Sequence, residues 1–208
     1  DADGRSIVFS SNRVGTFGLW RISASGGTPE SLPAIGDKAF SPAISRQGNR
    51  LAFVELMLDA NIWRVPGPLA SSQQASLFIS STRWDHDAQF SGDSKRITFS
   101  SARSGFLEIW VCDAAGLNPI PLTNGYKASS PHWSPNGQSI AFGSNIESHA
   151  DIYVINAAGG IPRRLTTESS EDVRPSWSQD GRWVYFGSNR SGDWQVWKAP
   201  AEGGQAVQ

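Results

Sequence analysis

Residues 131–144 read PHWSPNGQSIAFGS, and this stretch decides the fold class. Residues 131–134 are predicted to form a first strand. It ends at Pro135-Asn136-Gly137, where asparagine and glycine are predicted to supply the positive φ angles of a tight hairpin. The next segment, 139–144, has the alternation of a β-strand. We therefore predict two antiparallel strands joined by a short turn.

The second of these strands carries apolar residues on both faces. Ile140 and Phe142 point to one side, and the small residues Ala141 and Gly143 point to the other. Both faces are therefore expected to be covered by neighbouring sheets, and the small residues allow one of them to approach closely.

Two further strands complete the unit. Residues 151–155 read as a third strand, and a fourth lies near 163–166. Pro162 suits an outer strand, because proline cannot donate a hydrogen bond to a neighbour. The unit is therefore a four-stranded sheet.

This unit recurs along the chain. One series of residues, spaced by 43 to 46 positions, is Phe9, Phe53, Phe99, Phe142 and Phe186. A second series follows the first by 10 or 11 residues and consists of Trp20, Trp63, Trp110, Tyr153 and Trp197. Such a period is typical of one four-stranded β-propeller blade per repeat. We predict an all-β propeller of about five blades with a 44-residue repeat and almost no helix.

The repeats divide a single predicted domain, 1–208. Their approximate bounds are 1–36, 37–82, 83–125, 126–168 and 169–208. The first repeat is expected to lack its innermost strand, and the last to lack the end of its outer strand. Because an unpaired sheet edge invites association, two alternatives stay open. The chain is part of a larger ring of six or more blades, or its open edges pair between copies.

Composition disfavours several classes of partner. The formal net charge is −1, which leaves no basic excess for phosphates, so no nucleic-acid partner is expected. Apolar stretches are far shorter than the roughly 18 residues that span a bilayer, so no membrane insertion is expected. The lone Cys112 excludes an internal disulfide and is predicted to be a small buried thiol.

The repeat resembles the PD40, or TolB-like, propeller repeat, which is WD40-like. The resemblance is carried by 134–137, Ile140-x-Phe142, Ile152-Tyr153 and 159–166, and it covers essentially the whole chain. Similar repeats occur in TolB, the periplasmic partner of the Pal lipoprotein, in propellers that cover serine peptidases of the prolyl oligopeptidase and tricorn type, and in sensor-like ends of bacterial regulators. The resemblance implies a binding or gating role, with any chemistry elsewhere, and a bacterial periplasmic or extracellular location.

Catalytic motifs point away from an enzyme. The sequence contains no Gly-x-Ser-x-Gly, no Gly-x-x-x-x-Gly-Lys-Ser/Thr and no His-Glu-x-x-His. The chain itself is therefore not expected to be catalytic.

The candidate binding site is the mouth of the central channel, because the innermost strands of a propeller line it. Charged and aromatic residues gather where these strands begin: Trp84, Asp85, His86, Asp87, Lys38, Lys127, Glu171, Asp172 and Arg174. They predict a site for a polar peptide or protein. Alternatively, Asp85, Asp87 and Asp172 hold calcium, although no cofactor is required. A third reading is a solvated funnel that binds nothing.

The remaining aromatic and basic repeats have simpler predicted roles. The tryptophans on repeat positions are expected to form cores between blades: Trp20, Trp63, Trp110, Trp133, Trp177 and Trp197. Trp84 and Trp194 lie in predicted loops, where an exposed indole could anchor a partner. Arg13, Arg103 and Arg190 occupy equivalent hairpins and are predicted to bind turn carbonyls.

Two kinds of function follow. The first is a non-catalytic scaffold that engages a protein or peptide through its channel mouth and top loops. The alternative is a substrate-gating propeller of a prolyl-oligopeptidase-like serine peptidase, or the sensor domain of a bacterial transcriptional regulator or kinase.

Overall fold

A computed structural model describes residues 4–15, 17–32, 39–44, 50–55, 59–65 and 74–208, without the side chain of Glu55. These residues form strands, turns and irregular segments, and no helix occurs among them. The described part of the chain accordingly offers no helix long and apolar enough to cross a bilayer. The prediction of an all-β fold is confirmed.

The chain divides into two compact units, 1–58 and 59–208. The first unit contains a three-stranded antiparallel sheet in the order β1-β2-β3 and the hairpin β4-β5. Their bounds are β1 (Ser6–Ser11), β2 (Gly18–Ser23), β3 (Glu30–Ser31), β4 (Ala39–Ile44) and β5 (Leu51–Glu55). Leu19 of β2 and Ala39 of β4 are almost fully buried and mark the core of this unit.

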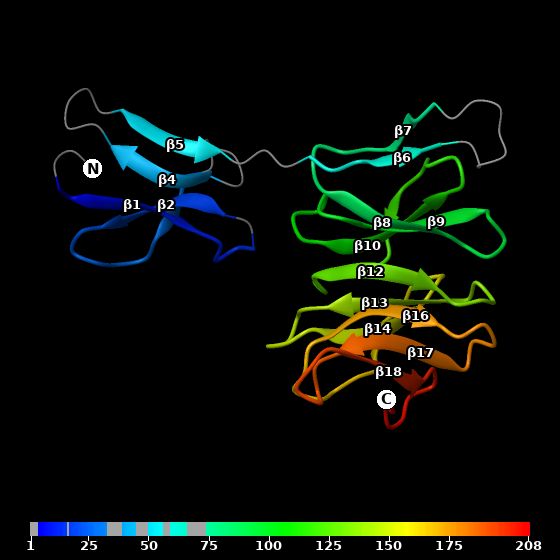
Figure 1. Cartoon of the computed structure of the whole chain (residues 1–208). Coiled ribbons are helices and arrows are strands. Elements are labelled where there is room, and N and C mark those ends of the chain that lie inside the picture. The colour runs from blue at the N-terminus through cyan, green and yellow to red at the C-terminus, as the bar shows by residue number, and fades with distance from the viewer. Residues whose placement is uncertain (1–3, 16, 33–38, 45–49, 56–58, 66–73) are drawn as a thin grey trace. The chain divides into compact units, whose positions relative to one another are not determined.

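The second unit contains four antiparallel sheets that follow one another from cyan to red in Figure 1. The first is the pair β6-β7, and three sheets of the repeat follow. The bounds are β6 (Ile62–Arg64), β7 (Ser76–Ile79), β8 (Asp85–Phe90), β9 (Arg96–Ser101), β10 (Glu108–Asp113), β11 (Ile120–Pro121), β12 (Ala128–Trp133), β13 (Ser139–Ser144), β14 (Asp151–Asn156), β15 (Arg163–Arg164), β16 (Asp172–Trp177), β17 (Trp183–Ser188) and β18 (Gln195–Pro200). Each of the last three sheets has its lowest-numbered strand at one edge.

Apolar cores of this unit lie between successive sheets. On β13, Ile140 and Phe142 pack with Ile109 of the preceding sheet. Ala141 packs with Val184 of the following sheet. The predicted division of the two faces of β13 is therefore confirmed, and both faces are covered.

The hairpin turns are held by side chains as well as by glycine. Gly137 has the predicted positive φ of 67°, but Asn136 does not. Its Oδ1 instead accepts hydrogen bonds from Ser134 Oγ at 2.7 Å and from the Gln138 amide at 3.0 Å. The turn thus relies on an Asx-type side-chain contact and needs left-handed backbone only at glycine.

Strand prediction was accurate in the repeat 126–168, with one shift. The predicted strand 139–144 matches β13, and 151–155 differs from β14 by one residue. The innermost strand β12 begins at Ala128, three residues before the predicted start. Residues taken for the approach to this strand therefore belong to the strand itself.

The predicted core residues of the repeats range from fully buried to exposed. Phe99, Phe142 and Phe186 are at most 2% exposed, and Cys112 is 3% exposed. Burial raises the pKa of the Cys112 thiol to about 11, as expected for an inert thiol. The predicted core tryptophans are less uniform. Trp133 is buried, four are half-buried, namely Trp20, Trp110, Trp177 and Trp197, and Trp63 on β6 differs from the prediction, because it is 61% exposed.

Candidate functional site

A β-bulge interrupts each innermost strand of the three repeat sheets in the second unit. The register shifts between His86 and Gln89 in β8, and at the equivalent places in β12 and β16. At these bulges Asp87, Ser130 and Arg174 have φ angles of 54°, 54° and 53°. Such left-handed conformations cost non-glycine residues about 1 kcal/mol or more, and they cluster at ligand sites.

The three bulges border one hollow of about 370 Å³. We call it the inner-strand hollow, and it is lined by Asp87, Ala88, Gln89, Ser130, Pro131, His132, Arg174 and Pro175. Because innermost strands face the axis of a propeller, this hollow is our candidate for the part of the predicted channel mouth that the second unit would supply.

An acidic group, a hydroxyl and a basic group meet along this row of bulges. Ser130 Oγ donates to Asp87 Oδ2 at 3.1 Å, and His86 Nδ1 lies 3.1 Å from the same oxygen. The hydrogen bond from His86 is the largest cause that lowers the pKa of Asp87, and desolvation opposes it. Asp87 is therefore a carboxylate at neutral pH.

Arg174 differs from the other arginines of its sheet. Its side chain is exposed and forms no hydrogen bond or ion pair with any described residue. Arg182 and Arg190 are bound to Asp180 and Asp172. The row therefore presents a guanidinium that is available to a ligand.

Two of the predicted site residues have another role. Asp85 and Asp172 begin β8 and β16 and are 1% and 0% exposed. Asp85 accepts hydrogen bonds from Ser101 Oγ at 2.5 Å and from Arg103 Nη2 at 2.9 Å and 3.0 Å. Asp172 accepts a hydrogen bond from Arg190 Nη2 at 2.7 Å. Both carboxylates form buried ion pairs within their own sheets.

These pairs correct two predictions. Arg103 and Arg190 bind carboxylates and serine hydroxyls, whereas turn carbonyls were predicted. The calcium prediction fails for Asp85 and Asp172, because buried guanidinium groups already neutralise them. Among the residues that the structure describes, no three His, Cys, Asp or Glu side chains lie together to hold a metal ion.

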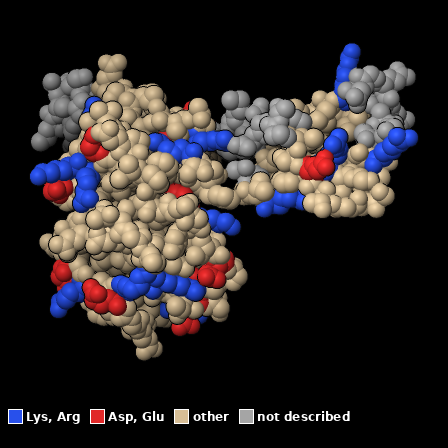
Figure 2. Space-filling view, turned by 180° about the vertical axis from the view of Figure 1, so that it is seen from behind, with Lys and Arg blue, Asp and Glu red and all other residues tan. Residues whose placement is uncertain are grey.

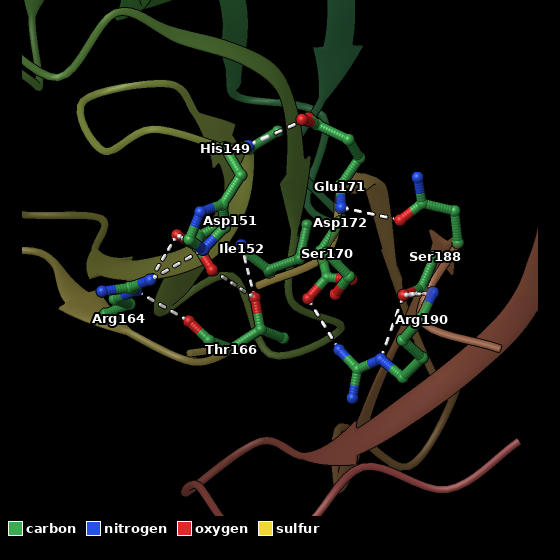
Figure 3. Close-up of polar contacts among 12 residues, drawn as sticks. His149, Asp151, Ile152, Arg164, Thr166, Ser170, Glu171, Asp172, Ser188 and Arg190 are labelled. Atoms are coloured by element: carbon green, nitrogen blue, oxygen red, sulfur yellow. Dashed lines mark hydrogen bonds and ion pairs between the residues drawn. The ribbon is translucent and has the colours of Figure 1, made fainter. Parts of the chain in front are cut away.

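Figure 3 shows a second buried carboxylate next to the Asp172 pair. Asp151, which begins β14, is 0% exposed and accepts a hydrogen bond from Arg164 Nη2 at 2.6 Å. His149 Nε2 lies 3.5 Å from it, and Thr166 Oγ1 donates to it at 3.3 Å. Burial raises the pKa of Asp151, while Arg164 opposes this. This cluster holds the sheet together.

The other described site residues, Trp84, Glu171 and Lys127, do not line the hollow. Trp84 is 41% exposed and meets the His86 ring edge to face at 6.0 Å. Glu171 accepts a hydrogen bond from the Ala150 amide at 3.0 Å, so it holds a loop. Lys127 precedes β12 with a φ of 48°. Lys38 lies outside the described residues.

Sequence reasoning missed Ser130 and His132, although both line the hollow. A signal was present, because a proline follows the bulge residue at the same position in three repeats, as Pro42, Pro131 and Pro175. A bulge is one of the few places where a sheet tolerates proline.

The surface charge of the second unit is mixed. On the face seen in Figure 2, its acidic and basic side chains are interspersed, so individual charged groups matter more than one broad electrostatic field.

His132, which lines the hollow, is expected to make the folding stability depend on pH. Burial lowers the pKa of His132, and the contact with the Trp133 carbonyl opposes this. The unfolded chain therefore takes up the proton first, and stability falls as the pH drops below about 6.5. When the pH is lowered from about 7.5 to about 5.5, the free energy of unfolding should fall less in His132→Gln than in the parent chain. Urea unfolding at the two pH values measures it. An equal or larger loss in the variant would contradict this assignment.

Comparison with known proteins agrees with the all-β fold. Residues 89–208 match the family described as PD40, the TolB beta propeller domain. The chain belongs to the TolB beta propeller family. The solved structure of TolB from Acinetobacter baumannii is similar over 99% of this chain and 52% of that one, with 22% identity and a TM-score of 0.62. At this identity, the TolB likeness establishes the fold.

Two curated bacterial proteins share parts of this TolB-like chain. The Protein TolB homolog of Chlorobaculum tepidum is 38% identical over 66 residues, which are 31% of this chain and 15% of that protein. The uncharacterized peptidase YuxL of Bacillus subtilis is 32% identical over 88 residues, which are 38% of this chain and 13% of that protein. The matches thus span less than a sixth of either relative.

Proposed function

We propose that this TolB-like propeller is a non-catalytic binding module that engages a protein or peptide at the inner-strand hollow. The observation that carries the proposal is the row of three left-handed bulges. It ends at Arg174, whose guanidinium has no partner among the residues that the structure describes. The row offers a carboxylate at Asp87, a hydroxyl at Ser130 and a cation at Arg174 within one hollow. Polar groups of both signs on a strained, fixed backbone suit recognition of a folded partner.

The likeness to TolB proteins supports a protein partner and a bacterial periplasmic location. Binding as proposed uses no metal or other cofactor, because the charged groups of the row contact the partner directly. Self-association through sheet edges is a separate part of the proposal. Analytical ultracentrifugation tests it, and a chain that stays monomeric at high concentration contradicts it.

The test uses a protein partner that the TolB resemblance names. We expect the chain to bind the soluble domain of the Pal lipoprotein from the same bacterium in calorimetry. Asp87→Asn is expected to weaken binding about tenfold, because it removes the negative charge of the row. Asparagine tolerates positive φ, so the bulge is kept.

Asp93→Asn is the matched control. Asp93 lies on the turn between β8 and β9 of the same sheet, away from the hollow, and it accepts hydrogen bonds that asparagine can keep. The affinity of the Asp93→Asn variant for Pal should equal that of the parent chain. Absence of Pal binding by the parent chain, or equal weakening by both variants, would refute the proposed function.

A second candidate function rests on the match to the peptidase YuxL. In that case the propeller gates access of substrates to a catalytic domain outside these residues. The purified chain would then fail to bind Pal, and its addition to the separated catalytic domain would change peptide turnover. Peptide turnover that is the same with and without the added propeller would reject this candidate.

A further inference from the structure

A second and larger hollow lies beside the inner-strand hollow. Its volume is about 640 Å³, within the range of pockets that hold small ligands. The β12–β15 sheet supplies Ser129, Ser130, Gly143, Ser144, Asn145 and Ala150, and the β16–β18 sheet supplies Val173, Arg174, Gly187 and Trp194. We call it the intersheet hollow.

Its only charged lining group is Arg174, which also borders the inner-strand hollow. This guanidinium has no partner among the described residues. Ser129 and Asn145 likewise make no side-chain hydrogen bond within the described part of the chain. Within the described residues the hollow therefore presents one cation and two polar groups without partners, and together they suit an anionic oxygen ligand.

Its apolar wall is an exposed indole. Trp194 is 56% exposed, and its ring covers the backbone of Gly187, where a Cβ atom would lie 3.7 Å from the indole. The equivalent residue of the preceding sheet is Ala150, which is 6% exposed on the opposite wall. A small residue on one wall and a large ring on the other leave room for a side chain to stack on the indole.

We propose that the intersheet hollow binds a peptide carboxylate that lies next to an apolar side chain. Arg174 holds the carboxylate through paired N–H donors, and Trp194 stacks on the apolar side chain. The carboxylate comes from a free C-terminus or from an acidic residue. The inference rests on the proposed function in that Arg174 serves both hollows.

The test compares three short acetylated peptides by calorimetry. The first, Gly-Gly-Ala-Phe, has a free C-terminus, the second is its amide, and the third is Gly-Glu-Phe-Ala amide, with an internal carboxylate. We expect at least one carboxylate peptide to bind about tenfold more tightly than the Gly-Gly-Ala-Phe amide. Whichever of the two carboxylate peptides binds more tightly identifies the source of the carboxylate, a free C-terminus or an acidic side chain.

Two variants assign the contacts. Arg174→Asn keeps a residue that tolerates positive φ, and it should remove the preference for the carboxylate peptide. Trp194→Ala should weaken binding of that peptide roughly tenfold. Arg182→Asn is the matched control, because Arg182 is exposed on the same sheet outside the hollow, and it should leave the affinity unchanged.

The outcomes separate this inference from the proposed function. Asp87 lines only the inner-strand hollow, and Trp194 lines only the intersheet hollow. The inference is overturned if no carboxylate peptide binds more tightly than the amide, or if Arg174→Asn keeps the preference. Pal binding that depends on Asp87 can persist in either case.

Discussion

Replacement of Arg190 by methionine is expected to destabilise the second unit by about 3 kcal/mol or more, because it leaves the Asp172 carboxylate buried without a counter-charge. Arg190 is 14% exposed and also packs over the rings of Phe186 and Trp197. Methionine retains part of this packing, so most of the loss is electrostatic. Urea unfolding followed by circular dichroism measures it.

The matched control is Arg182→Met in the same sheet. Arg182 also pairs with an aspartate, Asp180, but its side chain is 79% exposed. Exposed pairs contribute less than about 1 kcal/mol, so this variant should unfold near the parent midpoint. Similar losses in the two variants would contradict the assignment of a buried ion pair.

The chain itself supplies a neutral version of the same pair. The preceding sheet has Ala128 at the position of Asp172 and Ile146 at the position of Arg190. The combined change Asp172→Ala and Arg190→Ile should therefore recover roughly half or more of the stability lost in Arg190→Met. A double variant that is no more stable than Arg190→Met would show that this sheet cannot accept the neutral pair.

Phe142→Ala is the second change with a large expected effect, a loss of about 3 to 5 kcal/mol from the cavity it leaves. Phe142 is 0% exposed, stacks on Tyr153 at 5.8 Å and meets Tyr126 edge to face at 6.2 Å. It fills the core between two successive sheets, which cannot collapse around the void without moving a whole sheet. Urea unfolding gives the loss directly.

Phe90→Ala is the control for this change. Phe90 ends β8 and is 50% exposed, so the same substitution should cost less than about 1 kcal/mol. Equal costs at the two positions would show that the core between the sheets contributes less than its burial indicates.

The sequence by itself determined the strands and the cores between the sheets of the second unit. The spacing of Phe99, Phe142 and Phe186 places one buried ring per sheet, and the turn at Ser134 and Asn136 fixes where two strands meet. These features depend on residues close together in the chain, so a local pattern suffices to predict them.

Only the tertiary structure decided which charged residues form the site. Ser130 and Asp87 are 43 residues apart in the chain, yet they share a hydrogen bond. Asp85 finds its partner Arg103 in a loop 18 residues later. No local pattern shows whether a carboxylate at the start of an inner strand meets a buried arginine or an open hollow.

The bulge is the physical reason for this division. In a regular strand, Asp85 and Asp87 would point to the same side, and the sequence predicted one role for both. The left-handed conformation at Asp87 breaks the alternation of β8. Asp85 is therefore buried in an ion pair, while the Asp87 side chain is 44% exposed and borders the inner-strand hollow.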